Sequence, residues 1–109
     1  MPKYLFTANY TTSGVKGLLA EGGSAREKVV ERLAKSLNGK LECQYWAFGK
    51  YDYVAIADLP DNAAAAALSL TVSASGSVAV STTALLTAKE VDEATKRGGE
   101  YRAPGAKAK

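Results

Sequence analysis

Histidine is absent from this sequence of 109 residues, and cysteine and tryptophan each occur only once. The chain therefore lacks the side chain that most often acts as a general base at neutral pH and most often binds metal ions. One cysteine without histidine excludes a zinc site of the usual kind, a Ser-His-Asp triad and a Cys-His pair within the chain. Neither a P-loop nor a Gly-x-Gly-x-x-Gly motif occurs. We expect no metal site and no cofactor.

Long apolar runs are also missing. No stretch approaches the ~18 apolar residues that a membrane span requires, and the first residues, 1–6, do not have the layout of a signal peptide. The single cysteine, Cys43, cannot form an internal disulfide. We interpret it as a buried strand thiol without a redox role, because no basic neighbour in the sequence lowers its pKa. These features predict a cytoplasmic protein without a membrane partner.

Positive charge is concentrated at one end of the chain. The formal net charge is +3, but residues 96–109 hold five basic residues and one acidic residue, which leaves nine basic and ten acidic residues in the rest. A nucleic-acid-binding domain usually gathers lysine and arginine on its folded surface. We therefore predict a basic, flexible tail over residues 98–109 and no nucleic-acid partner.

The remaining chain reads as alternating strands and helices. Short segments of alternating or β-branched residues, bounded by turn residues, predict strands over 3–10, 40–48, 53–58 and 77–86. Helical periodicity and capping residues predict helices over 24–37, 62–75 and 87–97, and a shorter helical turn within 11–23.

Capping residues mark the expected helix starts. Ser24 with Glu27, and Thr87 with Glu90, have the spacing of a capping box, in which side chains and backbone satisfy each other's hydrogen bonds. Ser13 is the expected cap of the short helical turn, and Asp61 precedes the alanine-rich helix as a natural cap.

The order β-α-β-β-α-β followed by a terminal helix predicts an α+β fold of the ferredoxin-like type. Two βαβ halves with right-handed crossovers form a four-stranded antiparallel sheet with helices on one face. We expect the turn 49–52 to join the two central strands of this fold. No linker divides residues 1–97, which we expect to form a single domain.

The sheet face without helices should be polar in a monomer. Here we expect it to carry Leu5 and Thr7 from the first strand, Trp46 and Phe48 from the second, and small residues from the fourth. A half-apolar open sheet favours association. We predict a homodimer formed sheet against sheet, with possible assembly into a higher oligomer.

The segment 45–53 holds five of the nine aromatic residues. Aromatic side chains near a carboxylate at a strand end are typical of a small-molecule pocket. The candidate ligand-binding residues are Tyr45, Trp46, Gly49, Tyr51 and Asp52. Tyr51 could donate a proton or hydrogen bond, and Asp52 could act as a base or orient a ligand. A hairpin turn explains the same residues structurally: glycine supplies a positive φ, and aspartate binds nearby backbone amides.

The stretches 48–54 and 58–61 resemble the GYD domain family, named for a glycine-tyrosine-aspartate signature that stands here as Gly49-Lys50-Tyr51-Asp52. The resemblance extends over roughly residues 2–97 and includes Pro2-Lys3-Tyr4, 37–41, 81–83 and Leu86-Thr87. It implies a ferredoxin-like domain related to dimeric α/β-barrel proteins, and it implies no particular activity, since this fold hosts many functions.

Three functions fit these observations. The leading one is a homo-oligomeric domain that binds a small molecule or another chain without catalysis, with no catalytic residue assigned. The alternatives are a cofactor-independent oxygenase or isomerase, and a structural assembly protein. Both pocket-based functions require a cavity of about 300 Å³ or more.

Overall fold

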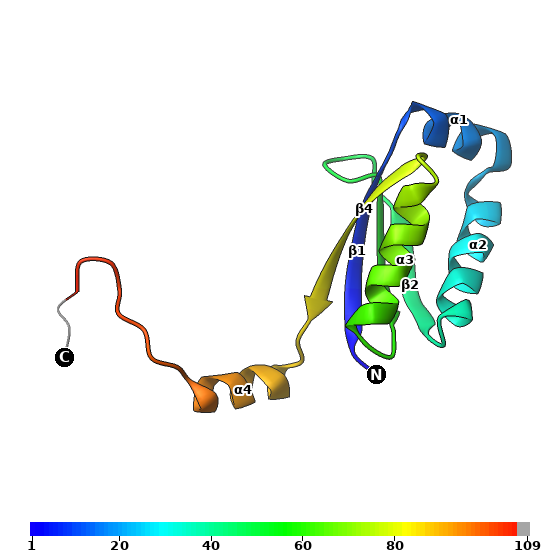
Figure 1. Ribbon diagram of the computed structural model, residues 1–109. Helices are drawn as coiled ribbons and strands as arrows, with labels where there is room; N and C mark the ends of the chain where they lie inside the picture. The colour runs from blue at the N-terminus through cyan, green and yellow to red at the C-terminus, as the bar shows by residue number, and fades with distance from the viewer. Residues whose placement is uncertain (107–109) are drawn as a thin grey trace.

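The sheet at the centre of this protein is covered by helices on one face only (Figure 1). The computed structural model describes residues 1–106. The strands are β1 (Lys3–Tyr10), β2 (Lys40–Trp46), β3 (Tyr53–Asp58) and β4 (Val78–Leu85). The helices are α1 (Thr12–Glu21), α2 (Gly23–Ser36), α3 (Asn62–Ala74) and α4 (Ala88–Arg97).

The strands form one antiparallel sheet in the order β2-β3-β1-β4. Two strands that a helical connection joins, β1 with β2 and β3 with β4, are not neighbours in the sheet: β3 lies between the first two and β1 between the second two. This is the arrangement of two interleaved βαβ units. This arrangement confirms the predicted ferredoxin-like α+β fold. The turn after β2 joins an edge strand to a central one, so the prediction that both of its strands are central in the sheet was wrong.

The core lies between the sheet and helices α2 and α3. β1 alternates strictly, and its buried residues Tyr4, Phe6 and Ala8 face the helices. β3 contributes three more buried side chains to the same layer, Tyr53, Ala55 and Ala57. Many of these side chains are small, and Leu59 is the largest that is completely enclosed. Alanine on the central strands allows α2 and α3 to approach the sheet closely.

A β-bulge changes which side chains of β2 face the helices. The pairing of β2 with β3 is regular except for a shift between Leu41 and Cys43. The extra residue reverses the alternation, because one inserted residue moves every later side chain to the opposite face. Trp46 therefore faces the helices, and the prediction that it lies on the open face was wrong. Cys43 was predicted to be buried on the same face as Leu41, but it lies on the open face and is only half-buried.

The helix starts follow the predictions in part. Thr87 and Glu90 form the predicted reciprocal capping box of α4, and Asp61 caps α3. In contrast, α1 is capped by Thr11 and not by Ser13. α2 begins at Gly23, after Gly22 with φ of 83°, and no side chain caps it.

The C-terminal segment stands apart from the rest of the protein (Figure 1). Every residue of α4 is exposed, and the molecule measures 62 × 31 × 22 Å. Residues 98–106 form neither helix nor strand; the remainder of the predicted tail, 107–109, lies outside the described residues. Within residues 1–106, none of the helices has the length and apolar character needed to cross a membrane.

Candidate functional site

The five candidate ligand-binding residues lie in three separate places. Trp46 points into the layer between sheet and helices, whereas Tyr45 is 70% exposed on the open face of the sheet. Gly49, Tyr51 and Asp52 lie in the loop between β2 and β3. The structure therefore does not bring the five side chains together around one pocket.

Asp52 fastens the loop to the central strand β1. Its carboxylate oxygen Oδ2 accepts a hydrogen bond from the backbone N–H of Tyr10 at 2.9 Å, and its own N–H donates to the carbonyl of Ala8 at 2.9 Å. The carbonyl of Asp52 accepts from the N–H of Ala47 at 3.0 Å. Two of these bonds join Asp52 to β1 and the third joins it to the residue that follows β2, which gives Asp52 a structural role.

The unusual backbone conformation of this loop belongs to Phe48. Phe48 has φ of 55°, whereas Gly49 is not among the residues with positive φ. Phe48 is also 63% exposed. A bulky residue in the left-handed region costs free energy that the surrounding contacts must offset. The prediction that the glycine of the signature supplies a positive φ was therefore wrong.

A small apolar cavity lies between the sheet and helices α2 and α3. Its volume is about 80 Å³, below the roughly 300 Å³ of a typical ligand pocket. Its aromatic lining is Phe6, Tyr10, Trp46 and Tyr53, and aliphatic side chains of the strands and of both helices complete it. Of the candidate residues, only Trp46 lines it. Tyr10 was missed, although it shares the inward face of its strand with Tyr4, Phe6 and Ala8.

The aromatic wall is held by two hydrogen bonds. The indole N–H of Trp46 donates to the hydroxyl of Tyr10 at 2.9 Å, and the hydroxyl of Tyr53 donates to Oε1 of Gln44 at 2.6 Å. The rings of Trp46 and Tyr53 meet edge to face, with centroids 5.1 Å apart. Burial raises the pKa of Tyr53 well above its usual value, so its hydroxyl stays protonated.

The chemistry that this cavity can support is limited. Within the described chain, the titratable groups on its wall are Tyr10, Tyr53 and Arg26. Arg26 makes a long ion pair with Glu21, at 3.6 Å. A protonated tyrosine and a guanidinium donate hydrogen bonds but do not remove protons at neutral pH. The arrangement suits binding of a small apolar group better than acid–base catalysis.

The open face of the sheet also carries apolar side chains. In the pairing register, Leu5 of β1 lies opposite Ile56 of β3, and Val54 lies opposite both Thr7 of β1 and Tyr45 of β2. All of them point away from α2 and α3. Val54 and Ile56 were not predicted on this face. The signal was present, because β3 reads Val-Ala-Ile-Ala and does not alternate with polar residues.

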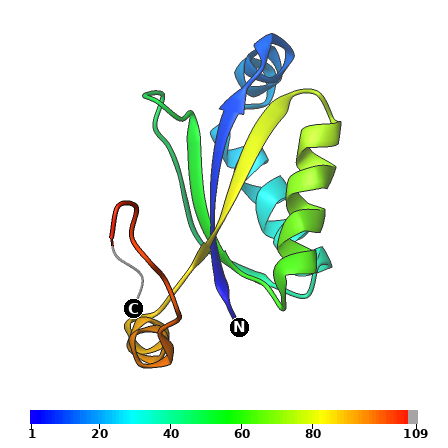
Figure 2. The same ribbon diagram turned by 60° about the vertical axis from the view of Figure 1, so that its left-hand side comes forward.

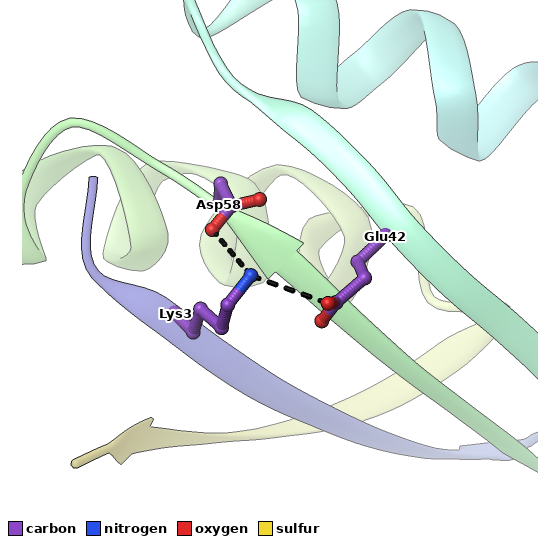
Figure 3. Close-up of polar contacts among 3 residues, drawn as sticks. All are labelled: Lys3, Glu42 and Asp58. Carbon is purple, nitrogen blue, oxygen red and sulfur yellow. Dashed lines mark hydrogen bonds and ion pairs between the residues drawn. The ribbon is translucent and has the colours of Figure 1, made fainter. Parts of the chain in front are cut away.

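An ion cluster marks one end of the open face (Figure 3). The ammonium group of Lys3 lies 2.9 Å from Oδ1 of Asp58 and 3.3 Å from Oε1 of Glu42, the residue inserted at the bulge. The hydrogen bond to Asp58 is the largest effect and raises the pKa of Lys3. Desolvation lowers this pKa by a smaller amount, and the weaker bond to Glu42 raises it again. The cluster gives the apolar surface a charged border.

Fold and surface together define an open-faced ferredoxin-like domain whose uncovered sheet is apolar in its middle. The sequence model of the GYD domain matches residues 4–95. The chain belongs to the GYD domain family, as the resemblance of its signature indicated. No curated protein and no solved structure matches it at a significant level.

Proposed function

We propose that this protein is a homo-oligomeric interaction domain, assembled by packing the open face of one sheet against that of a second copy. The observation that supports this proposal most is the middle of that face, where Leu5, Val54 and Ile56 lie side by side with no helix of the described chain over them (Figure 2).

The physical reason is the cost of leaving this surface in water. Burial of apolar area contributes about 25 cal/mol per Å², so the part of the half-buried Leu5, Val54 and Ile56 that is still exposed, together with the exposed Tyr45, favours a covered state. Two twisted sheets pack about 10 Å apart through such side chains. Thr7 and Thr83 around them are neutral and tolerate contact with a partner.

A charge placed in the middle of the face tests the proposal. Ile56→Glu would bury a carboxylate in the interface, which strongly disfavours association. Ser24→Glu, on the exposed start of α2, is the matched control. We expect sedimentation velocity to show a smaller species for Ile56→Glu only, with an unchanged circular dichroism spectrum. Equal sedimentation of both variants and the wild type would overturn this proposal.

Binding of a small molecule in the cavity between the sheet and helices α2 and α3 is the second candidate function. It is supported by the hydrogen-bonded aromatic wall of Tyr10, Trp46 and Tyr53. The volume of about 80 Å³ restricts a fully enclosed group to a few heavy atoms.

The fluorescence of Trp46, the single tryptophan, tests this candidate. A ligand that enters the cavity must contact the indole and change its emission. We expect native mass spectrometry of the purified protein to show a bound small molecule, and its removal to shift the emission. An unliganded mass together with unchanged emission across a library of small apolar compounds would refute the binding function.

A further inference from the structure

Every residue of the C-terminal arm, residues 86–101 with α4 at its centre, is exposed in the structure of residues 1–106. Its side chains are segregated by character. Leu86 precedes a stripe formed by Ala88, Val91, Ala94 and Thr95, and the opposite face holds all six charged residues of α4. Leu86 is 65% exposed and Val91 46%.

An exposed helix of this length is not stable by itself. Isolated helices shorter than about 12–15 residues are marginal in water, and most helical stability in proteins comes from packing of the apolar face. α4 has 10 residues. Its capping box and charged ends favour the helix. The apolar stripe still requires a surface to cover it.

A groove on the helix-covered side of β4 offers such a surface. It is an open hollow of about 440 Å³ between α3 and β4. Its floor is Tyr4, whose hydroxyl donates to Oδ1 of Asn62 at 2.6 Å. Its walls are small or aliphatic: Ala65, Ala66, Ser69, Leu70, Thr82 and Ala84. Groove and stripe both lack charged side chains, and small residues on both allow close approach.

The arm of the same chain lies on the wrong side to fill this groove. In both views α4 lies beyond the end of β4 and away from α2 and α3, whereas the groove opens on the side of those helices (Figures 1 and 2). The capping box holds Thr87 in an extended conformation, with ψ of 162°, so the chain leaves β4 without reversing.

A second copy on the open face would be within reach. α4 is about 15 Å long at 1.5 Å per residue, and packed sheets lie about 10 Å apart. The length of α4 exceeds this separation, so a helix on the open side of one sheet is long enough to reach the far side of the partner's sheet, where the partner's groove opens.

We propose that the arm of each chain docks into the α3–β4 groove of a second copy, with Val91 and Leu86 against Ala66 and Leu70. The two copies exchange arms reciprocally, and the exchanged arms stabilise the interface between the two open faces. This inference rests on the proposed dimer and adds the contact that gives α4 its packing surface. A lipid surface fits the arm less well, because α4 carries three acidic and three basic residues and a stripe of small side chains.

Crosslinking of single-cysteine chains tests the exchange. In a Cys43→Ser background, one chain carries Val91→Cys and another carries Ala66→Cys; both positions are exposed. The mixed chains are treated with a short bismaleimide. We expect a covalent heterodimer of twice the 11.4 kDa chain mass. The control replaces Val91→Cys by Lys89→Cys on the charged face of α4, and we expect a several-fold lower yield.

Sedimentation of the same samples separates this inference from the proposed function. A dimer that crosslinks through position 91 and not through position 89 supports the exchange. A dimer without this crosslink, or with equal yields from both positions, overturns the exchange and leaves the sheet-to-sheet dimer standing. A chain bearing both Val91→Cys and Ala66→Cys that crosslinks only within itself shows that the arm folds back and also overturns it. A monomer overturns both proposals.

Discussion

Removal of the Asp52 carboxylate tests whether the family signature is structural. Asp52→Ala leaves the backbone bonds to Ala8 and Ala47 in place and removes the acceptor of the Tyr10 N–H, which is bound at 2.9 Å. A hydrogen bond to a charged group contributes about 1.5–3 kcal/mol. Because both residues are only half-buried, the low end of this range applies. We expect the free energy of unfolding of Asp52→Ala to be about 1.5 kcal/mol lower than that of the wild type.

For a domain of this size, each kcal/mol lowers Tm by about 4–8 °C. Thermal unfolding followed by circular dichroism should therefore show Tm reduced by about 6–12 °C for Asp52→Ala. Asp52→Asn keeps an oxygen that can accept the hydrogen bond, so its Tm should fall less than that of Asp52→Ala. Lys50→Ala, at an exposed position in the same loop, is the control and should change stability by less than about 0.5 kcal/mol. An unchanged Tm for Asp52→Ala would refute the structural role.

Three further predictions concern the packing and charges around the sheet. Gly14→Ala should lower the free energy of unfolding in urea by about 1–3 kcal/mol, because the added methyl group would overlap the backbone carbonyl of Ser77. Gly17→Ala, in the same helix, is the control: its methyl group would have open space, so this variant should be neutral or stabilising. Trp46→Phe removes the hydrogen-bond donor to the hydroxyl of Tyr10, so we expect its free energy of unfolding, measured by thermal unfolding, to be lower than that of the wild type by about 1–2 kcal/mol. A Tm equal to that of the wild type would show that this hydrogen bond does not stabilise the fold. The raised pKa of Lys3 means that its ion cluster stabilises the fold below pH 10.5 and loses this effect as pH rises through the folded pKa. The stability difference between wild type and Lys3→Met should therefore shrink above that pH, and a constant difference would argue against the cluster.

Features determined by neighbouring residues were predictable from the sequence. The capping box of Thr87 and Glu90 depends on residues three apart and was confirmed. The same pattern at Ser24 and Glu27 did not form a cap, because Gly22 and Gly23 let the helix begin one residue earlier. A capping pattern predicts a helix start only where the preceding backbone does not provide another.

Features that depend on pairing between strands were less predictable. The bulge at Glu42 has no glycine or proline to mark it, and it moved Trp46 from the open face to the cavity. The candidate residues at 45–52 were therefore divided among three environments. The apolar middle of the open face could have been found, because Val54 and Ile56 are separated by alanine and not by polar residues.

The exposed state of α4 could not be deduced from its sequence. Its apolar stripe at Ala88, Val91 and Ala94 predicts a surface helix that packs on something, and the sequence does not say on what. Only the structure shows that this helix leaves β4 away from α2 and α3 (Figure 2).

The mass of the wild-type protein in solution is the most direct test of the proposed association through the open face. Sedimentation equilibrium over a range of micromolar concentrations measures it without a label or substitution. We expect a species of at least twice the 11.4 kDa chain mass. A single species with the mass of one chain at every concentration would contradict the proposal, since the apolar surface of Leu5, Val54 and Ile56 would then remain in water.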